Sequence, residues 1–145
     1  EKGFIIVGQE TDGTVTPYDL GMDWIVSKKK SDFIGKRALE RESMSEPQRK
    51  QLVGLLTTDP QKVIPEGAHA VLNPNQDTPM EMLGHVSSSY YSPNLKHSIA
   101  MALLKGGFNR KGQIVYIPML NGEQPIEAKI VDPIFFDKKG DRLRG

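Results

Sequence analysis

The chain has 145 residues, with 19 Lys and Arg against 18 Asp and Glu, so its formal net charge is only +1. This balance gives no reason to expect nucleic acid or an anionic membrane as a partner, and the absence of Cys excludes disulfides and thiolate metal sites. No apolar run approaches the length of a membrane span, and no signal peptide is visible, so we expect a cytoplasmic protein. Ten Pro, fourteen Gly and 37% hydrophobic residues indicate a turn-rich, mostly β protein of one or two small domains.

The N-terminal residues combine several turn signals. Phe4 to Val7 predicts a strand close to the start of the chain, and the first residue, Glu1, is not a Met. We therefore expect the chain to be a piece of a longer protein. Asp12-Gly13 predicts a turn. Thr16-Pro17 is typical of a helix N-cap followed by Pro at the first helical position, and Gly21 fits the stop of that helix after about one turn.

The next stretch predicts a short strand, a basic turn and a helix. Met22 to Val26 favours a strand whose Trp24, the only Trp, packs in the core. Lys28 to Lys30 form the basic turn, and a helix is expected from Lys36 to Arg41. The polar run Glu42 to Arg49 is the best candidate for a boundary between two parts of the chain.

Beyond this boundary, short apolar runs alternate with turns, which predicts a β-sandwich or barrel. Propensity alone makes one run, Ser98 to Lys105, helical, and at this length periodicity does not decide. Asn121-Gly122 is a strong turn signal between two of the runs. The expected strands are Leu52–Leu56, Ala68–Leu72, Met82–Tyr91, Ile99–Leu104, Ile114–Met119, Ile126–Val131 and Ile134–Phe136.

Standard catalytic and metal-binding signatures are absent from the sequence. His69, His85 and His97 are not in helical register and form no metal motif, so we expect each at the surface or satisfied in the core. Ser87 to Ser89 predict small polar residues on the outer face of a strand rather than a nucleophile.

Several motifs in order resemble the aminomethyltransferase (glycine cleavage T-protein) family. Its patterns R-L-E-x-G, Y-G-x-E, T-P, G-L-G-W and D-F-I-G have counterparts at Glu1-Lys2-Gly3, Gly8-Gln9-Glu10, Thr16-Pro17, Gly21-Met22-Asp23-Trp24 and Asp32-Phe33-Ile34-Gly35. Within this family, the amino-acid sequence of residues 9–17 and 50–57 is most similar to the α subunits of heterotetrameric sarcosine oxidases. The resemblance covers essentially the whole chain.

The resemblance implies a mainly β fold in which an α+β N-terminal part precedes a Greek-key jelly-roll or β-barrel domain. Residues 1–45 would be the C-terminal end of a T-protein-like folate-binding domain, residues 50–138 the barrel, and residues 139–145 a charged tail. It also makes Ser98 to Lys105 a strand.

The resemblance implies two folate-binding residues and no catalytic or metal-binding ones. Glu1 matches the Glu of R-L-E-x-G, whose two carboxylate oxygens suit adjacent N–H donors of a pterin. Lys28 to Lys30 stand where the family has Arg residues. Lys cannot form the bidentate contact of Arg, so only point-charge attraction to the glutamate carboxylates of folate remains. We assign this contact to Lys29. Ser92 to Leu95 resemble an S-P-x-L loop that lines the site or forms a turn. Phe135-Phe136 stand where the family has a Tyr, which puts a hydroxyl contact there in doubt.

The family's catalytic Asp lies upstream of Glu1, so the resemblance implies that this chain is not catalytic alone. It would contribute to a tetrahydrofolate site that captures the one-carbon unit of oxidised sarcosine as 5,10-methylene-tetrahydrofolate. Flavins and NAD would be bound only elsewhere in the parent enzyme, and the partners would be the rest of the α subunit and the other oxidase subunits. The alternatives are a fragment of a dimethylglycine dehydrogenase or aminomethyltransferase, and a non-enzymatic β-barrel module that serves assembly.

Overall fold

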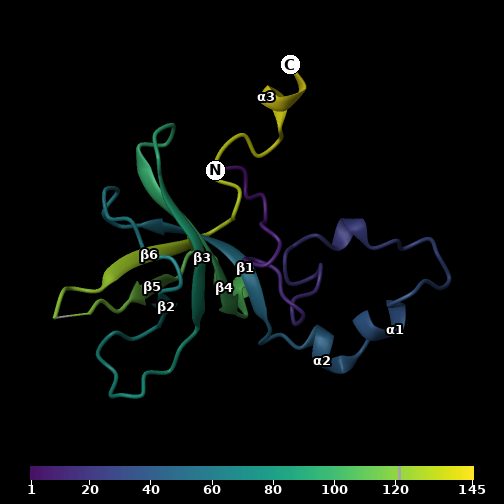
Figure 1. Ribbon diagram of the computed structural model, residues 1–145, viewed down its shortest axis with the longest axis horizontal. Coiled ribbons are helices and arrows are strands. Elements are labelled where there is room, and N and C mark those ends of the chain that lie inside the picture. Colours follow the sequence, from purple (N-terminus) through teal and green to yellow (C-terminus); the bar gives the residue numbers. More distant parts are fainter. Residues whose placement is uncertain (121) are drawn as a thin grey trace.

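The computed structural model describes residues 1–120 and 122–145, so the expected Asn121-Gly122 turn lies partly outside the described residues. Its main feature is one antiparallel sheet that curves into a nearly closed barrel (Figure 1). The strands are β1 (Lys50–Thr57), β2 (His69–Ala70), β3 (Gly84–Ser92), β4 (His97–Lys105), β5 (Ile114–Ile117) and β6 (Ile126–Val131). This confirms the mainly β barrel expected from the sequence, with Ser98 to Lys105 inside β4 and not in a helix.

The strand order β2-β3-β4-β1-β6-β5 brings the two edge strands together. Val71, directly after β2, forms an antiparallel bridge with Tyr116 of β5, with both N–H···O distances at 2.9 Å. This bridge nearly closes the barrel and satisfies backbone groups that an open edge would leave unpaired. Ile134 to Phe136, expected as a last strand, lies outside the sheet.

Burial differs between the two sides of the barrel. β5 and β6 alternate buried with more exposed residues, as strands with one solvated face do. β1, β3 and β4 instead contain runs of four or three buried residues, because residues from both ends of the chain cover their outer faces. The barrel interior is filled by Val53, Leu55, Ile64, Ala70, Leu83, Val86, Ala100, Ala102, Leu104, Val115, Ile117, Ile126, Ala128 and Ile130.

Residues 1–49 wrap around the barrel mainly as turns. The short helix expected after Thr16 is a hydrogen-bonded turn instead, although its cap is present: Asp19 N–H donates to Thr16 Oγ1 and Thr16 N–H donates back to Asp19 Oδ2 at 2.9 Å. Gly21, at φ +68°, ends it, and Met22 N–H reaches back to Pro17 O at 2.8 Å in the pattern of a Schellman stop. Arg49 then binds Asp19 through both carboxylate oxygens, which ties this turn to the start of β1.

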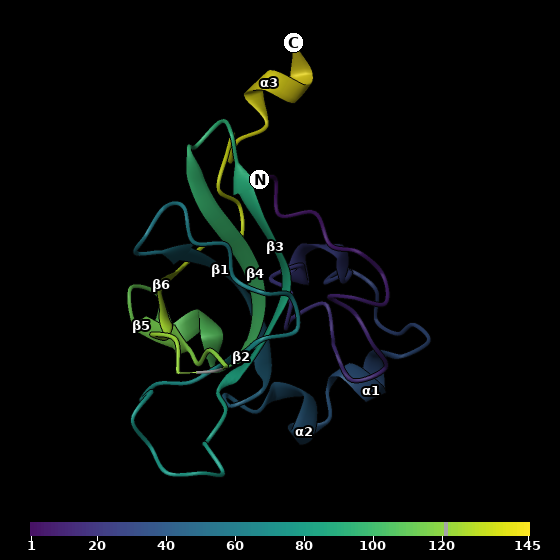
Figure 2. The ribbon, with the colours of Figure 1, turned by 60° about the vertical axis from the view of Figure 1, so that its left-hand side comes forward.

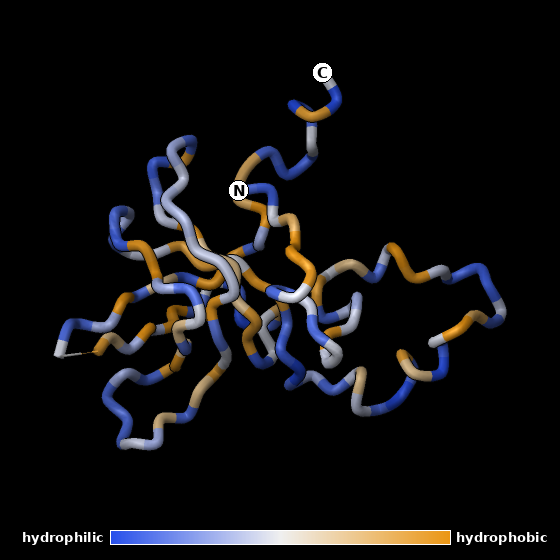
Figure 3. Tube along the Cα trace, in the orientation of Figure 1, coloured by the Kyte–Doolittle hydropathy of each residue, from blue (hydrophilic) through white to orange (hydrophobic). Residues whose placement is uncertain are grey.

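Two expected strands in this part are wrong. Phe4 to Val7 forms no strand, and its only ladder contact within the described residues is a single bridge from Val7 to Thr11. Asp23–Ile25 is the 3₁₀-helix η1 rather than part of a strand, and Trp24, expected in the core, is 74% exposed. Figure 3 shows hydrophobic residues also in the part of the chain around η1 and the helix that follows it, which extends away from the barrel. In that part of the chain the side chains have no sheet face to pack against.

The helices are short. α1 (Lys36–Leu39) confirms the expected helix start, although it ends before Arg41, and α2 (Glu42–Ser45) follows within the polar boundary segment. η2 (Gly107–Arg110) caps the barrel near β1, and α3 (Asp141–Arg144) lies in the charged tail. No helix in the described part of the chain is long and apolar enough to cross a membrane.

Candidate functional site

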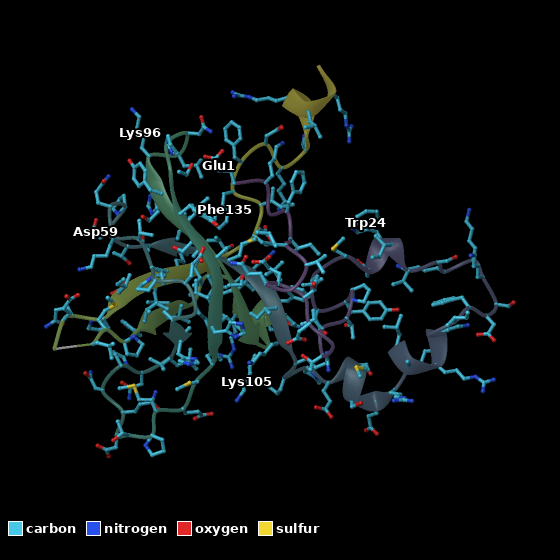
Figure 4. All side chains as sticks on the ribbon, viewed as in Figure 1. Glu1, Trp24, Asp59, Lys96, Lys105 and Phe135 are labelled. Atoms are coloured by element: carbon cyan, nitrogen blue, oxygen red, sulfur yellow. The ribbon has the colours of Figure 1, made fainter. Side chains whose placement is uncertain are left out.

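Glu1 is held by contacts from the β3–β4 connection and from the segment after β6. Ser92 Oγ donates to Glu1 Oε1 at 2.5 Å and Asn94 Nδ2 donates to Glu1 Oε2 at 2.8 Å. The backbone N–H groups of Phe135 and Phe136 both donate to Glu1 O, at 2.9 and 3.1 Å. Figure 4 shows Glu1 above the barrel, near Phe135. The side chain of Glu1 therefore has a fixed orientation relative to the loop between β3 and β4.

These contacts keep Glu1 ionised. The hydrogen bond from Ser92, followed by that from Asn94, lowers the pKa of the Glu1 carboxyl below its ordinary value. Ser92 and Asn94 donate to different oxygens, so both ends of the carboxylate are fixed in position. The carboxylate is thus a charged acceptor with a defined orientation.

A hollow of about 370 Å³ lies directly beside Glu1. This volume falls within the range of roughly 300–1,000 Å³ that small-molecule sites occupy. Its walls come from the N-terminal segment, from the outer faces of β3 and β4, and from the segment after β6. Apart from Glu1 and Lys2, the residues that line it are neutral: Gly3, Phe4, Ile6, Ser88, Tyr90, Ile99, Ala100, Met101, Pro133 and Phe135.

A second, larger hollow of about 670 Å³ lies on the other side of residues 2–4. Trp24, Met22 and Phe108 contribute to its apolar lining, and Glu1 does not. Its basic groups are already paired, since Lys2 forms an ion pair with Asp137 and Lys111 one with Asp132. The smaller hollow is the better candidate site, because its carboxylate, Glu1, is held by neutral donors, whereas Asp132 in the larger hollow is already paired with Lys111 and Lys138.

The basic turn lies apart from both hollows. Lys28 pairs with Asp23 at 3.4 Å, and both side chains are largely exposed. Lys29 and Lys30 are also exposed, and neither lines either hollow. The structure therefore does not bring Lys29 next to Glu1.

The N-terminal segment that carries Glu1 is anchored on an irregularity of the barrel. The register of β3 against β4 shifts between Val86 and Ser88, so Ser87 bulges out, and Gln9 Nε2 donates to Ser87 O. Next to it, the fully buried Glu10 accepts from Ile6 N–H at 2.6 Å through Oε2. A turn fixed at the bulge in this way determines where residues 1–6 cross β3 and β4.

Sequence reasoning placed the S-P-x-L loop beside the site or in a turn, and Ser92 and Asn94 of that loop contact Glu1. The contribution of Asn94 and the anchor at Gln9 have no short-range signal, because their partners lie 93 and 78 residues away. Ser87 to Ser89 are buried rather than on an open outer face; Gln9 contacts Ser87, and Ser88 lines the hollow beside Glu1. Among the described residues, no group of three or more His, Cys, Asp or Glu side chains is arranged to hold a metal ion.

The barrel also matches a known family. Residues 50–137, more than half of the chain, match the family described as the glycine cleavage T-protein C-terminal barrel domain. The chain belongs to this family. A crystal structure of glycine cleavage system aminomethyltransferase T from Bartonella henselae shares the fold, with a TM-score of 0.73 and 24% identity over 90% of this chain and 35% of that one.

Two sarcosine oxidase α subunits are more similar to this T-protein family member than an aminomethyltransferase is. The "Sarcosine oxidase subunit alpha" proteins of Corynebacterium sp. (strain P-1) and Rhizobium meliloti (strain 1021) are 46% and 40% identical over 100% and 99% of the chain. The aminomethyltransferase of Clostridium botulinum (strain Okra / Type B1) is 33% identical over 96%. The chain spans 15% of the length of the first relative and 35% of the last.

Proposed function

We propose that this chain forms the C-terminal part of a sarcosine oxidase α subunit and provides one side of its tetrahydrofolate site. The observation that carries the proposal is the Glu1 carboxylate, held ionised by Ser92 and Asn94 at the edge of an apolar-walled hollow. Identity of 40–46% to sarcosine oxidase α subunits over essentially the whole chain supports this parent over an aminomethyltransferase.

In this proposal, the pterin ring of tetrahydrofolate enters the hollow and donates from its 2-amino group and neighbouring ring N–H to the two oxygens of Glu1. A paired, charge-assisted contact of this kind fixes both the position and the orientation of a planar ring. Phe4, Tyr90 and Met101 in the lining offer apolar surface to its faces. The ring would thus be oriented with its reactive nitrogens directed away from Glu1, toward residues outside this chain.

The chemical step would use residues that this chain does not contain. Oxidation of sarcosine at a flavin elsewhere in the parent gives an imine, and tetrahydrofolate captures its one-carbon unit as 5,10-methylene-tetrahydrofolate. This chain binds and orients the acceptor, in contact with the rest of the α subunit and with the other oxidase subunits. Capture competes with hydrolysis of the imine, so its efficiency depends on how well the acceptor is held.

Lys29 would act on the tail of folate rather than on its ring. Because Lys28 already pairs with Asp23, Lys29 is the more available charge in the basic turn for the glutamate carboxylates of the tail. An exposed point charge adds little affinity and is screened by salt. Lys29→Ala should therefore weaken folate binding only a fewfold, and only at low ionic strength.

The test of the proposal is the product distribution of the complete enzyme that carries Glu1→Gln. The amide keeps the local contacts, since its oxygen accepts from Asn94 and its NH₂ donates to Ser92 Oγ. Toward the pterin, however, the NH₂ group faces an N–H group, and two donors form no hydrogen bond. Sarcosine should still be oxidised at the wild-type rate, while the product shifts from 5,10-methylene-tetrahydrofolate toward free formaldehyde. An unchanged product ratio at limiting folate would refute the role of Glu1.

A further inference from the structure

A third hollow, of about 800 Å³, lies where the loop between β2 and β3 meets the segment between β5 and β6. We call it the methionine hollow, because three of its fourteen lining residues are Met and three are Pro. The lining residues are Pro65, Glu66, Gly67, Ala68, His69, Val71, Thr78, Pro79, Met80, Met82, Pro118, Met119, Leu120 and Glu123.

The methionine hollow is not part of the folate site. No residue lines both this hollow and the hollow beside Glu1. Figures 1 and 2 show β2 and β5 on the side of the barrel away from α1 and α2, so the N-terminal part of the chain does not cover them. A function of the methionine hollow is therefore independent of whether folate binds.

Some apolar side chains of the methionine hollow are exposed to solvent and do not belong to the barrel core. Leu120 is 83% exposed and Met82 is 45% exposed, and neither belongs to the barrel core, whereas Met119 packs partly against it. Contiguous apolar surface of this kind marks an interaction site. A small-molecule site would instead enclose most of its ligand and direct several polar groups at it, whereas Leu120 projects outward here.

The chemistry of the lining describes the occupant. Thioether side chains adapt to irregular apolar surfaces and are common where a protein binds a partner segment. The only acidic or basic side chains among the fourteen, apart from His69, are Glu66 and Glu123, and there is no Lys or Arg. Glu66 accepts a long hydrogen bond from Ser89 N–H at 3.4 Å, and Glu123 has no ion pair within the described residues. An occupant with apolar residues at its centre and Lys or Arg at its ends complements this surface.

We propose that the methionine hollow is a docking surface for an apolar, basic-flanked segment of another subunit of the enzyme. The inference rests on the part of the proposed function that places this chain in a multi-subunit oxidase. It does not depend on Glu1 or on folate. The segment would insert its apolar side chains among Met80, Met82 and Met119, with a Lys or Arg close to Glu123.

The test uses the complete, assembled enzyme with a photo-crosslinking amino acid at Leu120. We expect a covalent product with a different subunit, and mass spectrometry should locate it in an apolar segment flanked by Lys or Arg. Products only within the same chain, no product at all, or a tightly held small molecule in native mass spectra would overturn the proposal.

Two charge-reversal substitutions, one at Glu123 and one at a control position, test the proposed contact between Glu123 and a Lys or Arg of the partner segment. Glu123→Lys should weaken subunit association about five- to tenfold at low salt, and the effect should shrink as salt rises. Glu40→Lys, an exposed position beside α1, is the matched control and should change association less than twofold. Equal effects of the two substitutions on subunit association would contradict the proposed contact at Glu123. Both variants should bind tetrahydrofolate as the wild type does. If the wild-type enzyme binds no tetrahydrofolate, the folate role in the proposed function is refuted, but the docking proposal is not.

Discussion

At the scale of single residues, the site depends on the ionisation of Glu1. The hydrogen bonds from Ser92 and Asn94 lower the pKa of this carboxyl, so it remains an acceptor over a wider range of acid pH than a free Glu would. Removing one of these donors should narrow that range.

We therefore expect Asn94→Ala to shift the pH dependence of folate binding. Binding needs the carboxylate and is lost as the pH falls through the pKa of Glu1. Because the variant lacks one of the contacts that lower this pKa, its binding should fail at a higher pH than that of the wild type. Affinity titrations of the complete enzyme between pH 4 and 7 would show this shift, and superimposable curves would mean that Asn94 does not act through Glu1.

Trp24 illustrates a residue whose environment the sequence did not reveal. With 74% of its surface exposed, Trp24→Ala should change the free energy of unfolding of this chain by less than about 1 kcal/mol. Leu55→Ala, at a fully buried position in the barrel, should cost about 2–5 kcal/mol. Denaturant titrations of both variants provide the comparison, and a large loss for Trp24→Ala would restore the core position expected from sequence.

Asp19 and Arg49 form the ion pair that joins the N-terminal turns to the barrel. Burial alone would raise the pKa of Asp19, but the hydrogen bonds from Arg49 and Thr16 outweigh it and lower the pKa below 3.8. Asp19→Asn should cost roughly 3 kcal/mol, because it leaves the Arg49 charge without its partner.

The sign of the pH effect follows from the lowered pKa of Asp19. Its stabilisation is complete above the ordinary pKa of 3.8 and is lost as the pH falls through the lower folded-state value. Asp23→Asn removes an exposed pair instead and serves as the control, with an expected change below about 0.5 kcal/mol. Equal losses for both variants would contradict the structural role of the buried pair.

At the scale of elements, the barrel was predictable because its strands carry local signals. Apolar runs of the right length between turns predicted five of the six strands to within a few residues, and the resemblance decided Ser98 to Lys105 in favour of β4. A further expected strand, Ile134 to Phe136, is not formed. Residues 1–49 were harder, because their conformation depends on distant partners such as Ser87 and Arg49. Apolar runs like Phe4 to Val7 have the composition of strands, but no neighbouring strand is available to pair with them.

Gly84 sets how closely β3 approaches β4. A Cβ at this position would lie 2.0 Å from Leu103 O, whereas one at Gly13 would meet nothing within 4 Å. Gly84→Ala should therefore destabilise the barrel by about 1–3 kcal/mol or more, and Gly13→Ala by less than about 0.5 kcal/mol. Thermal unfolding of the two variants tests this, and an unchanged Tm for Gly84→Ala would argue against the close pairing.

At the scale of the whole molecule, the two ends of the chain meet at the site. Glu1 binds the backbone of Phe135 and Phe136, and Lys2 pairs with Asp137, so the barrel domain and the N-terminal segment form the site together. The sequence indicated Glu1 through a family motif, but the hollow beside it and its contacts with Ser92 and Asn94 emerge only from the folded chain. The proposed role of Lys29 rests on the motif alone, because the basic turn lies apart from the hollow.

The most direct test of this site is calorimetric titration of tetrahydrofolate into the complete enzyme, with and without Glu1→Gln. We expect the substitution to weaken binding by roughly tenfold to a hundredfold, the effect of losing a charge-assisted hydrogen bond. Glu40→Gln, at an exposed position away from the hollow, should bind like the wild type. Equal affinity of wild type and Glu1→Gln would contradict the assignment of Glu1 to folate.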